Sequence, residues 1–463
     1  MYRIRIKDSK NAYELTELAK MFVSSESLDI DVLSAESREC AADFTVPSAA
    51  EMDRNAQKRA LYTFLAEKTG KQLDWGTLTG VRPVKLFAQI AAKHAENGSG
   101  CSDNKTLTAA EGTLQQEYLI SPEKTALLRH TYEVQQRAGR DRDHHAVGIY
   151  VGIPFCPTRC LYCSFTSNRF TEKAAAEYLK ALYKEIDAVR SIMDDRGLYA
   201  ESIYIGGGTP TSLTEEMFAE MTGRVSDAFL RPKTAEYTVE CGRPDTITAS
   251  KLKSLKSAGA GRISINPQTM KEATLKLIGR QHSPEQIEEA FALARTCGID
   301  CINMDLIAGL PEETEADFAM TMDRIIAMGP ENITVHTLAV KKGSRLIEAD
   351  KDYSYRQAET VRSMLKTGST KLAEAGYEPY YLYRQKHMAG NFENVGYCKK
   401  GSASLYNIRI MDEDQSIIAL GAGGISKVYY PEENRLERVP NVSNYEIYIE
   451  RIDEMIERKE KGL

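Results

Sequence analysis

The sequence predicts an α/β fold: a partial parallel (β/α)6 barrel of the TIM type, with a small α/β domain before it and an α+β extension after it. Between residues 147 and 345, short apolar segments alternate with longer amphipathic ones. Most of the short segments are apolar on both faces, as the strands of a helix-covered parallel sheet are. Polar and glycine-rich residues follow several of them, and barrel enzymes carry their chemistry at that end of their strands.

Residues 1–140 are predicted to form the small N-terminal domain. The segment YRIRI alternates between apolar and polar residues as a strand does, and NAYELTELAKMF has the apolar spacing of a helix. A further helix is expected to begin at Pro83 and to end at Gly98. The polar, charged segment AGRDRDHHAV, residues 138–147, predicts a linker to the barrel.

The barrel domain is assigned to residues 147–345. Its six strands are predicted at residues 147–153, 202–207, 236–241, 262–266, 301–309 and 332–339, with amphipathic helices between them. Residues 346–463 form the C-terminal region, which we expect to cover a substrate. Within that region LGAGG, residues 420–424, is interpreted as a packing or barrel-closing turn.

Composition and charge exclude several classes of protein. The chain has 463 residues, 42% of them hydrophobic and 27% charged, which is typical of a globular protein. A net charge of −6 argues against bulk electrostatic binding to nucleic acid or anionic lipid. No apolar run is long enough to span a membrane, and the charged start MYRIRIKDSK is no secretory signal. Nine cysteines, an odd number, favour the reducing cytoplasm over a disulfide-linked secreted fold.

Three cysteines lie close together directly after the first barrel strand. Cys156, Cys160 and Cys163 stand in the segment CPTRCLYC, in a loop that Pro154 and Pro157 keep from becoming helical. An odd number of thiols argues against a disulfide framework, and a structural zinc site normally has four ligands. Three thiolates suit a [4Fe–4S] cluster that keeps one iron open for another ligand. A partial zinc site or unrelated thiols are the alternatives.

These residues and their surroundings resemble a known family. The pattern C-x3-C-x2-C with Tyr162 before its last cysteine resembles the signature of the radical S-adenosylmethionine superfamily. The segments IYVGIPFC, IYIGGGTPTSL, TVECGRPDTIT, RISINPQT, LKLIGRQH and NMDLIAGLP resemble the oxygen-independent coproporphyrinogen III oxidase (coproporphyrinogen dehydrogenase) family. WGTLTGVRP and YYLYRQKHMAGNFENVGY resemble its HemZ-like subgroup, so the resemblance extends over essentially the whole chain.

The resemblance implies two cofactors. The three cysteines would hold a [4Fe–4S] cluster, and S-adenosylmethionine would chelate the open iron through its amino and carboxylate groups. An electron from a donor such as flavodoxin or ferredoxin would then cleave the sulfonium and release a 5′-deoxyadenosyl radical. The protein's own task is to bind, orient and shield these groups.

The resemblance also implies which residues contact S-adenosylmethionine. The turn formed by Gly206, Gly207, Gly208 and Thr209 would hold the methionyl amino group; its alternative is a tight strand-to-helix turn. Glu240, Gln268, Arg280 and Asp305 would make polar contacts, with Arg280 on the carboxylate and Gln268 and Asp305 on the ribose. Ile307 and Ala339 would contact the adenine. Each polar residue, taken alone, is equally explained as a satisfied group in a loop.

Other residues are candidates for contact with the substrate. Tyr150 would assist the radical step, or else packs in the core as a strand aromatic. Arg384 and Lys386 follow Tyr380, Tyr381 and Tyr383, and aromatic faces with basic side chains suit a tetrapyrrole that carries propionates. Their alternative is an ordinary strand with surface cations. His336 and His387 are weaker candidates as haem ligands, and Arg82 is either an anion contact or a helix-terminal salt bridge.

The family's activity implies an anaerobic enzyme of haem biosynthesis. It would convert two propionates of coproporphyrinogen III to vinyl groups and give protoporphyrinogen IX. One departure matters: well-characterised oxidases of the family have a further cysteine two residues after the third, and this chain has Phe165 there. The related haem-chaperone branch also has an aromatic residue at that position. The alternatives are therefore a haem-binding chaperone or carrier, or a radical enzyme that methylates haem or opens its ring.

Overall fold

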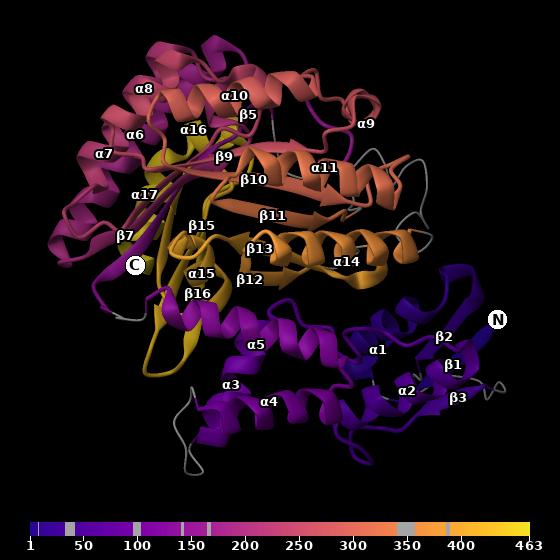
Figure 1. Ribbon diagram of the computed structural model, residues 1–463. Helices are drawn as coiled ribbons and strands as arrows, with labels where there is room; N and C mark the ends of the chain where they lie inside the picture. The colour runs from indigo at the N-terminus through magenta and orange to yellow at the C-terminus, as the bar shows by residue number, and fades with distance from the viewer. Residues whose placement is uncertain are drawn as a thin grey trace.

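Figure 1 shows the fold of the chain. The computed structural model describes residues 1–7, 9–32, 42–95, 103–139, 143–163, 168–339, 357–385 and 389–463. Phe165, Lys386 and His387 lie outside the described residues. Within the described part of the chain, no helix combines the length and the apolar character that crossing a membrane requires.

The centre of the fold is a run of six parallel strands that are adjacent in the sheet in their chain order. They are β4 (Ala146–Ile153), β7 (Tyr199–Gly207), β8 (Glu236–Glu240), β9 (Arg262–Gln268), β10 (Cys301–Ala308) and β11 (Asn332–Thr337). All six strands predicted from the sequence are present, and the α/β fold class is confirmed. Their interior positions are buried on both faces, as in β4, where only Tyr150 is partly exposed.

Helices connect these strands and cover the sheet (Figure 1). They are α6 (Glu172–Asp195), α7 (Glu215–Phe229), α8 (Ala249–Ser257), α9 (Glu272–Leu277), α10 (Pro284–Thr296) and α11 (Glu315–Met328). Five of them begin at a serine or threonine whose side chain accepts a hydrogen bond from the first turn: Thr171, Thr214, Thr248, Ser283 and Thr314. These caps satisfy backbone N–H groups that the helix itself leaves open, so they fix where each helix starts.

The C-terminal region extends the sheet at both edges. On one side β14 (Ile417–Leu420) pairs parallel with β4, followed by β15 (Ile425–Tyr430) and β16 (Arg435–Pro440). On the other side β13 (Glu393–Cys398) pairs antiparallel with β11, and β12 (Glu378–Arg384) pairs with β13. The helices of this region are α14 (Ala358–Glu374), α15 (Leu405–Asp412), α16 (Tyr445–Glu450) and α17 (Ile452–Gly462). Within the part of the chain that the structure describes, the result is a sheet of eleven strands.

The N-terminal region has two parts. A three-stranded parallel sheet, β1 (Tyr2–Ile6), β2 (Leu28–Val32) and β3 (Phe44–Val46), packs with α1 (Ser9–Phe22) and α2 (Arg54–Thr69) around a core of its own. The helices α3 (Pro83–Ala95), α4 (Asn104–Glu117) and α5 (Pro122–Arg137) instead share the buried apolar core of the barrel. Helix α5 runs along the edge of the large sheet beside β12 (Figure 1).

Candidate active site

A cavity of about 410 Å³ lies at the C-terminal ends of the parallel strands. Barrel folds place their active sites at this edge because several loops converge there. The cavity is lined by most of the residues that the sequence indicated for the metal, the cofactor and the radical step: Tyr150, Cys156, Cys160, Cys163, Gly207, Gly208, Thr209, Glu240, Gln268, Arg280, Asp305, Ile307 and Ala339. Residues from six different strand ends are thus brought together.

Backbone hydrogen bonds hold the cysteine loop in place. The two-residue strand β5 (Phe155–Cys156) pairs with β6 (Asn168–Arg169), and the N–H of Phe170 donates to the carbonyl of Cys156 at 3.0 Å. In the middle of the loop, the N–H of Leu161 donates to the carbonyl of Ile278 at 3.0 Å. Leu161 and Tyr162 also pack on a small apolar cluster that includes Ile278 and Ile307. The loop is therefore fixed at both ends and at its centre.

The donor set fits an iron–sulfur cluster. Cys156, Cys160 and Cys163 are not disulfide bonded, and all three line the cavity. Among the described residues, no group of three His, Cys, Asp or Glu side chains is gathered tightly enough to hold a single metal ion. Three thiols from one loop that line the same cavity are the donor type that a [4Fe–4S] cluster with one open iron would need.

The glycine turn after β7 lets the backbone approach the cysteine loop. The N–H of Gly208 donates to the carbonyl of Ile153 at 2.8 Å, and the N–H of Thr209 donates to that of Phe155 at 2.7 Å. A Cβ on Gly208 would lie 2.4 Å from the Phe155 oxygen and 3.0 Å from the Cys156 sulfur. A Cβ on Gly206 would lie 2.9 Å from the Glu240 carboxylate. These two glycines leave the space that the loop and Glu240 occupy.

We predict that Gly208→Ala displaces Cys156 and lowers cluster content, because the new methyl group collides with backbone that cannot move aside. Overpacking of this kind costs about 1–3 kcal/mol of folding free energy. Iron and sulfide per chain after anaerobic reconstitution are the measurement. Gly223→Ala is the matched control: its Cβ meets nothing within 4 Å in helix α7, so cluster content should stay at the wild-type level. Equal cluster content in both variants would contradict the close-approach argument.

Two buried arginines donate hydrogen bonds to side chains of the cysteine loop. The Arg280 guanidinium donates to the carbonyls of Gly242 and Asn266 at 2.9 and 2.7 Å and to the hydroxyl of Tyr162 at 3.0 Å. Its Nε is buried and has no hydrogen-bond partner among the described residues. Arg243 grips Asp245 with a two-pronged contact at 3.0 and 3.1 Å and donates to the hydroxyl of Thr158 at 2.9 Å. Both arginines thus contact the segment between the first and third cysteines.

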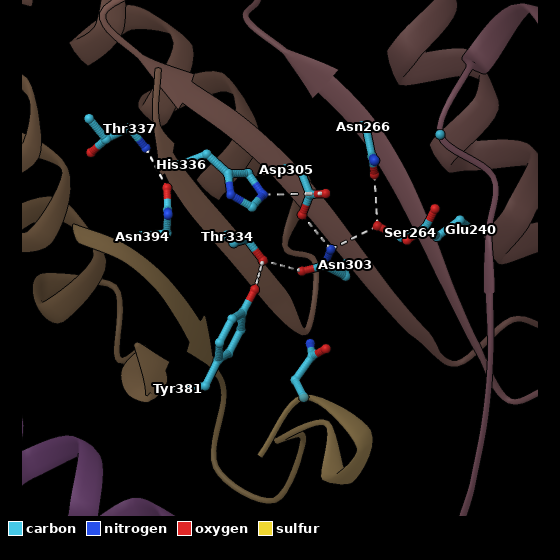
Figure 2. A network of polar contacts seen from close by, with 12 residues as sticks. Glu240, Ser264, Asn266, Asn303, Asp305, Thr334, His336, Thr337, Tyr381 and Asn394 are labelled. Carbon is cyan, nitrogen blue, oxygen red and sulfur yellow. Dashed lines mark hydrogen bonds and ion pairs between the residues drawn. The ribbon is translucent and has the colours of Figure 1, made fainter. Parts of the chain in front are cut away.

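The strands that form the cavity floor carry a polar network (Figure 2). Asn303 donates to Asp305 at 2.7 Å and to Ser264 at 2.8 Å. The His336 ring nitrogen lies 3.7 Å from the Asp305 carboxylate. Burial alone would raise the pKa of Asp305, but His336 and Asn303 hold that pKa below its ordinary value. Asp305 is therefore a carboxylate at neutral pH and is available to bind hydroxyl groups.

Sequence reasoning missed several members of this network, Ser264, Asn266, Asn303 and Thr334, and indicated His336 only as a weaker candidate for a haem ligand. A signal was present, because polar residues stand two apart within otherwise apolar strands, as in Asn303 with Asp305 and Thr334 with His336. Side chains two apart in a strand share a face. Gln268, which was expected, ends β9 with φ 71° and lies beside a register shift between β9 and β10. That left-handed backbone is costly for a residue with a side chain and is typical of functional sites.

Two further tyrosines, Tyr150 and Tyr204, line the cavity near Glu240. The Tyr204 hydroxyl donates to Glu240 at 2.7 Å, and the Tyr204 ring stacks on Tyr406 with ring centres 4.5 Å apart. Tyr150 lies beside both rings, at 6.3 and 6.5 Å. Burial raises the pKa of Glu240 to about 7, with the Tyr204 hydrogen bond acting against it. Glu240 is thus the cavity carboxylate that changes charge near neutral pH.

Two basic residues indicated by the sequence lie elsewhere. The Arg384 guanidinium is buried away from the cavity lining and donates to the carbonyls of Leu78 and Asn391 at 2.6 and 2.8 Å. Its strand neighbours Tyr381 and Tyr383 do line the cavity. Arg82 forms an ion pair with Glu413, which corresponds to the salt-bridge alternative.

Comparison with known proteins agrees with this site. Residues 150–325 match the Radical SAM superfamily. The chain is 38% identical over 429 residues to the oxygen-independent coproporphyrinogen-III oxidase-like protein HemZ of Bacillus subtilis, covering 91% of this chain and 83% of that protein. It is 31% identical over 276 residues to the heme chaperone HemW of the same organism, covering 59% of this chain and 69% of HemW.

One solved structure shares the fold. Coproporphyrinogen III oxidase (HemN) from Escherichia coli, described as a radical SAM enzyme, superposes with a TM-score of 0.54 at 21% identity and covers 70% of this chain and 72% of that one. The superfamily match runs from β4 through β10 and into α11 and includes the cysteine loop, whereas the cavity-lining residues of β11, β12 and β13 lie outside it. The long match to HemZ extends to the flanking regions as well. The chain therefore belongs to the radical SAM superfamily and, within it, to the family of oxygen-independent coproporphyrinogen III oxidase-like proteins.

Proposed function

We propose that this protein is a radical S-adenosylmethionine oxidoreductase that decarboxylates two propionates of coproporphyrinogen III. The observation that carries the proposal is the single cavity in which three cysteines, a glycine turn and strand-end polar residues meet a tyrosine-lined wall. The names of the relatives supply the substrate class, a tetrapyrrole. An electron donor such as flavodoxin or ferredoxin would supply the electron that cleaves S-adenosylmethionine, and an electron acceptor would take the electron that each propionate loses together with its CO2.

In this proposal each group of residues has a defined task. Cys156, Cys160 and Cys163 hold a [4Fe–4S] cluster, with S-adenosylmethionine bound between the glycine turn and the polar floor. When bound, these two cofactors supply a carbon radical that abstracts a hydrogen atom from the substrate. The Asp305 carboxylate accepts a hydrogen bond from a ribose hydroxyl, and the Gln268 amide forms a further hydrogen bond with the ribose hydroxyls. Ile307 and Ala339 cover the adenine. The buried Arg280 fixes the loop through Tyr162 and adds positive charge beside the carboxylate site.

The substrate lies against the tyrosines in this account. Tyr150, Tyr381 and Tyr383 line the cavity, and aromatic side chains with polar tips suit a large apolar ring with polar substituents. The Tyr383 hydroxyl lies 3.4 Å from a His336 ring nitrogen, so the two side chains orient each other. The surrounding amides and hydroxyls exclude bulk water and hold one substituent of the ring toward the cysteine loop.

We predict that the affinity for S-adenosylmethionine falls as the pH drops from 8 to 6. Because burial raises the pKa of Glu240 to about 7, its carboxylate is charged above that pH and mostly protonated one unit below it. The ligand carries a sulfonium cation, so the loss of this negative charge weakens binding by up to about tenfold. Equilibrium binding to the reconstituted protein is the measurement. Glu240→Gln should bind weakly and lose the pH dependence centred near pH 7, keeping only the part that comes from the amino group that ligates the iron.

The control for this prediction is Glu313→Gln. Burial also raises the pKa of Glu313 to about 7, but Glu313 is bound to Thr269 and does not line the cavity. Its variant should keep the wild-type pH dependence of binding. A pH dependence that survives in Glu240→Gln and disappears in Glu313→Gln would show that the titrating group has been assigned to the wrong carboxylate.

Anaerobic turnover tests the function itself. The reconstituted protein is given a reductant, S-adenosylmethionine and coproporphyrinogen III, and products are followed by mass spectrometry. We expect loss of two CO2 per porphyrinogen together with formation of 5′-deoxyadenosine. Intact coproporphyrinogen beside abundant 5′-deoxyadenosine would mean that the radical chemistry is right and the substrate is wrong.

A haem chaperone is the second candidate function. It is favoured by the identity to HemW, a protein named as a heme chaperone, and by Phe165 in place of the further cysteine. In that case the protein binds haem and passes it to an apoprotein, and it releases no CO2 from coproporphyrinogen. Haem transfer to an apo-haemoprotein, measured from the absorbance of the product, separates the two functions.

A further inference from the structure

Strands β12 and β13 form one wall of the cavity, called here the β12–β13 wall. They pair so that Tyr383 lies opposite Asn394 and Arg384 lies opposite Glu393. Successive side chains of a strand point to opposite faces of the sheet. Tyr383 and Asn394 line the cavity, whereas Arg384 and Glu393 contact the N-terminal region. The wall thus has a substrate side and an outer side.

Residues 75–81 are bound to the outer side of β12. The Arg384 backbone N–H donates to the carbonyl of Val81 at 2.8 Å, and its guanidinium donates to that of Leu78 at 2.6 Å. The guanidinium also lies 5.1 Å from the Trp75 ring centre, within the range of a cation–π contact. Arg384 therefore ties the wall to the segment WGTLTGVR, residues 75–82.

Glu393 ties β13 to the same region. Its two carboxylate oxygens accept from Lys124 Nζ at 2.6 Å and from Trp75 Nε1 at 2.7 Å. Trp75, Lys124 and Glu393 are 3%, 7% and 3% exposed. Hydrogen bonds to a buried charge are strong, and losing one leaves that charge poorly compensated. The carboxylate is thus held on both oxygens by residues more than 260 positions away in the chain.

Glu393 and the next residue of β13, Asn394, both contact Thr337 at the end of β11. The carbonyl of Glu393 accepts from the Thr337 hydroxyl at 2.8 Å, and the Asn394 side-chain oxygen accepts from the Thr337 N–H at 2.8 Å. Figure 2 shows Asn394 and Thr337 in this contact beside His336. A displacement of Glu393 therefore displaces Asn394 and the cavity end of β11 with it.

We propose that Glu393 is a positioning residue through which Trp75 and Lys124 of the N-terminal region set the substrate side of the β12–β13 wall. This assigns a role in substrate recognition to a region outside the radical SAM match. The role in tetrapyrrole binding rests on the proposed function, whereas the mechanical link from Trp75 to the wall does not. The cysteine loop and the glycine turn have no part in this link.

The test compares Trp75→Phe with Tyr448→Phe. Each variant removes one hydrogen bond to a buried carboxylate that is paired with a lysine: Glu393 with Lys124, or Glu185 with Lys459. Tyr448→Phe keeps its ring, whereas Trp75→Phe also replaces the indole by a smaller phenyl ring, so both should lower the unfolding temperature and Trp75→Phe should lower it more. Only Trp75→Phe should speed hydrogen exchange at Thr337 and in residues 378–384 and 393–398, by about tenfold.

Binding of coproporphyrin III, followed by its Soret band, is measured on the same reconstituted proteins. Trp75→Phe should weaken it about tenfold and leave the affinity for S-adenosylmethionine unchanged, whereas Tyr448→Phe should change neither. The positioning role would be overturned if Trp75→Phe left hydrogen exchange in the β12–β13 wall unchanged. It would also be overturned if exchange there became faster while the porphyrin affinity stayed the same. If the wild type binds no porphyrin while exchange responds as expected, the link stands and the proposed function fails.

Discussion

Replacing Cys160 by alanine should abolish both cluster retention and the formation of 5′-deoxyadenosine. Cys160 is the central thiol of the three that line the cavity, and it lies between backbone contacts that fix the loop. Two thiolates cannot hold a cube that keeps one iron open. Iron content, the visible absorbance of the cluster and 5′-deoxyadenosine yield after reduction are the measurements, and all three should fall to background.

Cys297→Ala is the matched control for this change. Cys297 is also a partly exposed, unpaired thiol, but it ends helix α10 and does not line the cavity. This variant should retain wild-type cluster content and wild-type yield of 5′-deoxyadenosine. An equal loss in both variants, or a full cluster in Cys160→Ala, would contradict the ligand assignment.

Replacing Lys459 by methionine should cost about 3–5 kcal/mol of the free energy of unfolding. Lys459 and Glu185 are both fully buried, and Lys459 Nζ lies 2.6 Å from the Glu185 carboxylate and 2.6 Å from the Asn441 side-chain oxygen. The substitution leaves Glu185 charged in the core without its cation. Helix α17 also loses one of its links to helix α6, at the carboxylate that accepts from the Gly421 N–H of the turn after β14 at 2.8 Å. Urea unfolding of the metal-free chain measures the loss.

A surface pair in the same helix provides the comparison. Lys461 and Glu457 form an ion pair between exposed side chains one turn apart, and such pairs contribute little because water screens them. Lys461→Met should therefore unfold at nearly the wild-type urea concentration. Lys459→Met combined with Glu185→Gln should recover part of the lost stability, because no unpaired charge then remains. A double variant as unstable as Lys459→Met would contradict the role given to charge.

The barrel could be predicted from the sequence because its signals are local. Each of the six strands is a short apolar run, five of the helices between them begin at a serine or threonine cap, and Cys156, Gly208 and Glu240 stand at or just after a strand end. Neighbouring parallel strands have their C-terminal ends at the same edge of the sheet, so residues that follow those ends lie close together. That rule indicated the cysteines, the glycine turn and Glu240, and the resemblance to the family supplied the other predicted contacts to S-adenosylmethionine.

The errors came from contacts between distant residues. Arg384 was grouped with Tyr381 and Tyr383 because they are neighbours in sequence, but adjacent residues of a strand face opposite ways, and no local pattern tells which face meets the cavity. The partners that decide it, Leu78 and Trp75, lie about three hundred positions earlier. The buried pair of Glu185 and Lys459, 274 positions apart, was invisible for the same reason.

The division of the N-terminal region also depended on packing. Helices α3, α4 and α5 have amphipathic patterns like those of α1 and α2, yet their apolar faces belong to the core of the barrel. An amphipathic pattern shows that a helix buries one face and does not show against what. The assignment of residues 1–140 as one domain therefore stays a prediction.

The central claim is that the cavity brings a propionate of coproporphyrinogen III to the radical source. The most direct measurement uses coproporphyrinogen III that carries deuterium on the β-carbons of its propionates, with mass spectrometry of the 5′-deoxyadenosine formed. The account predicts that deuterium appears in 5′-deoxyadenosine in step with loss of CO2 from the substrate. Formation of 5′-deoxyadenosine without deuterium, with the labelled substrate intact, would contradict it.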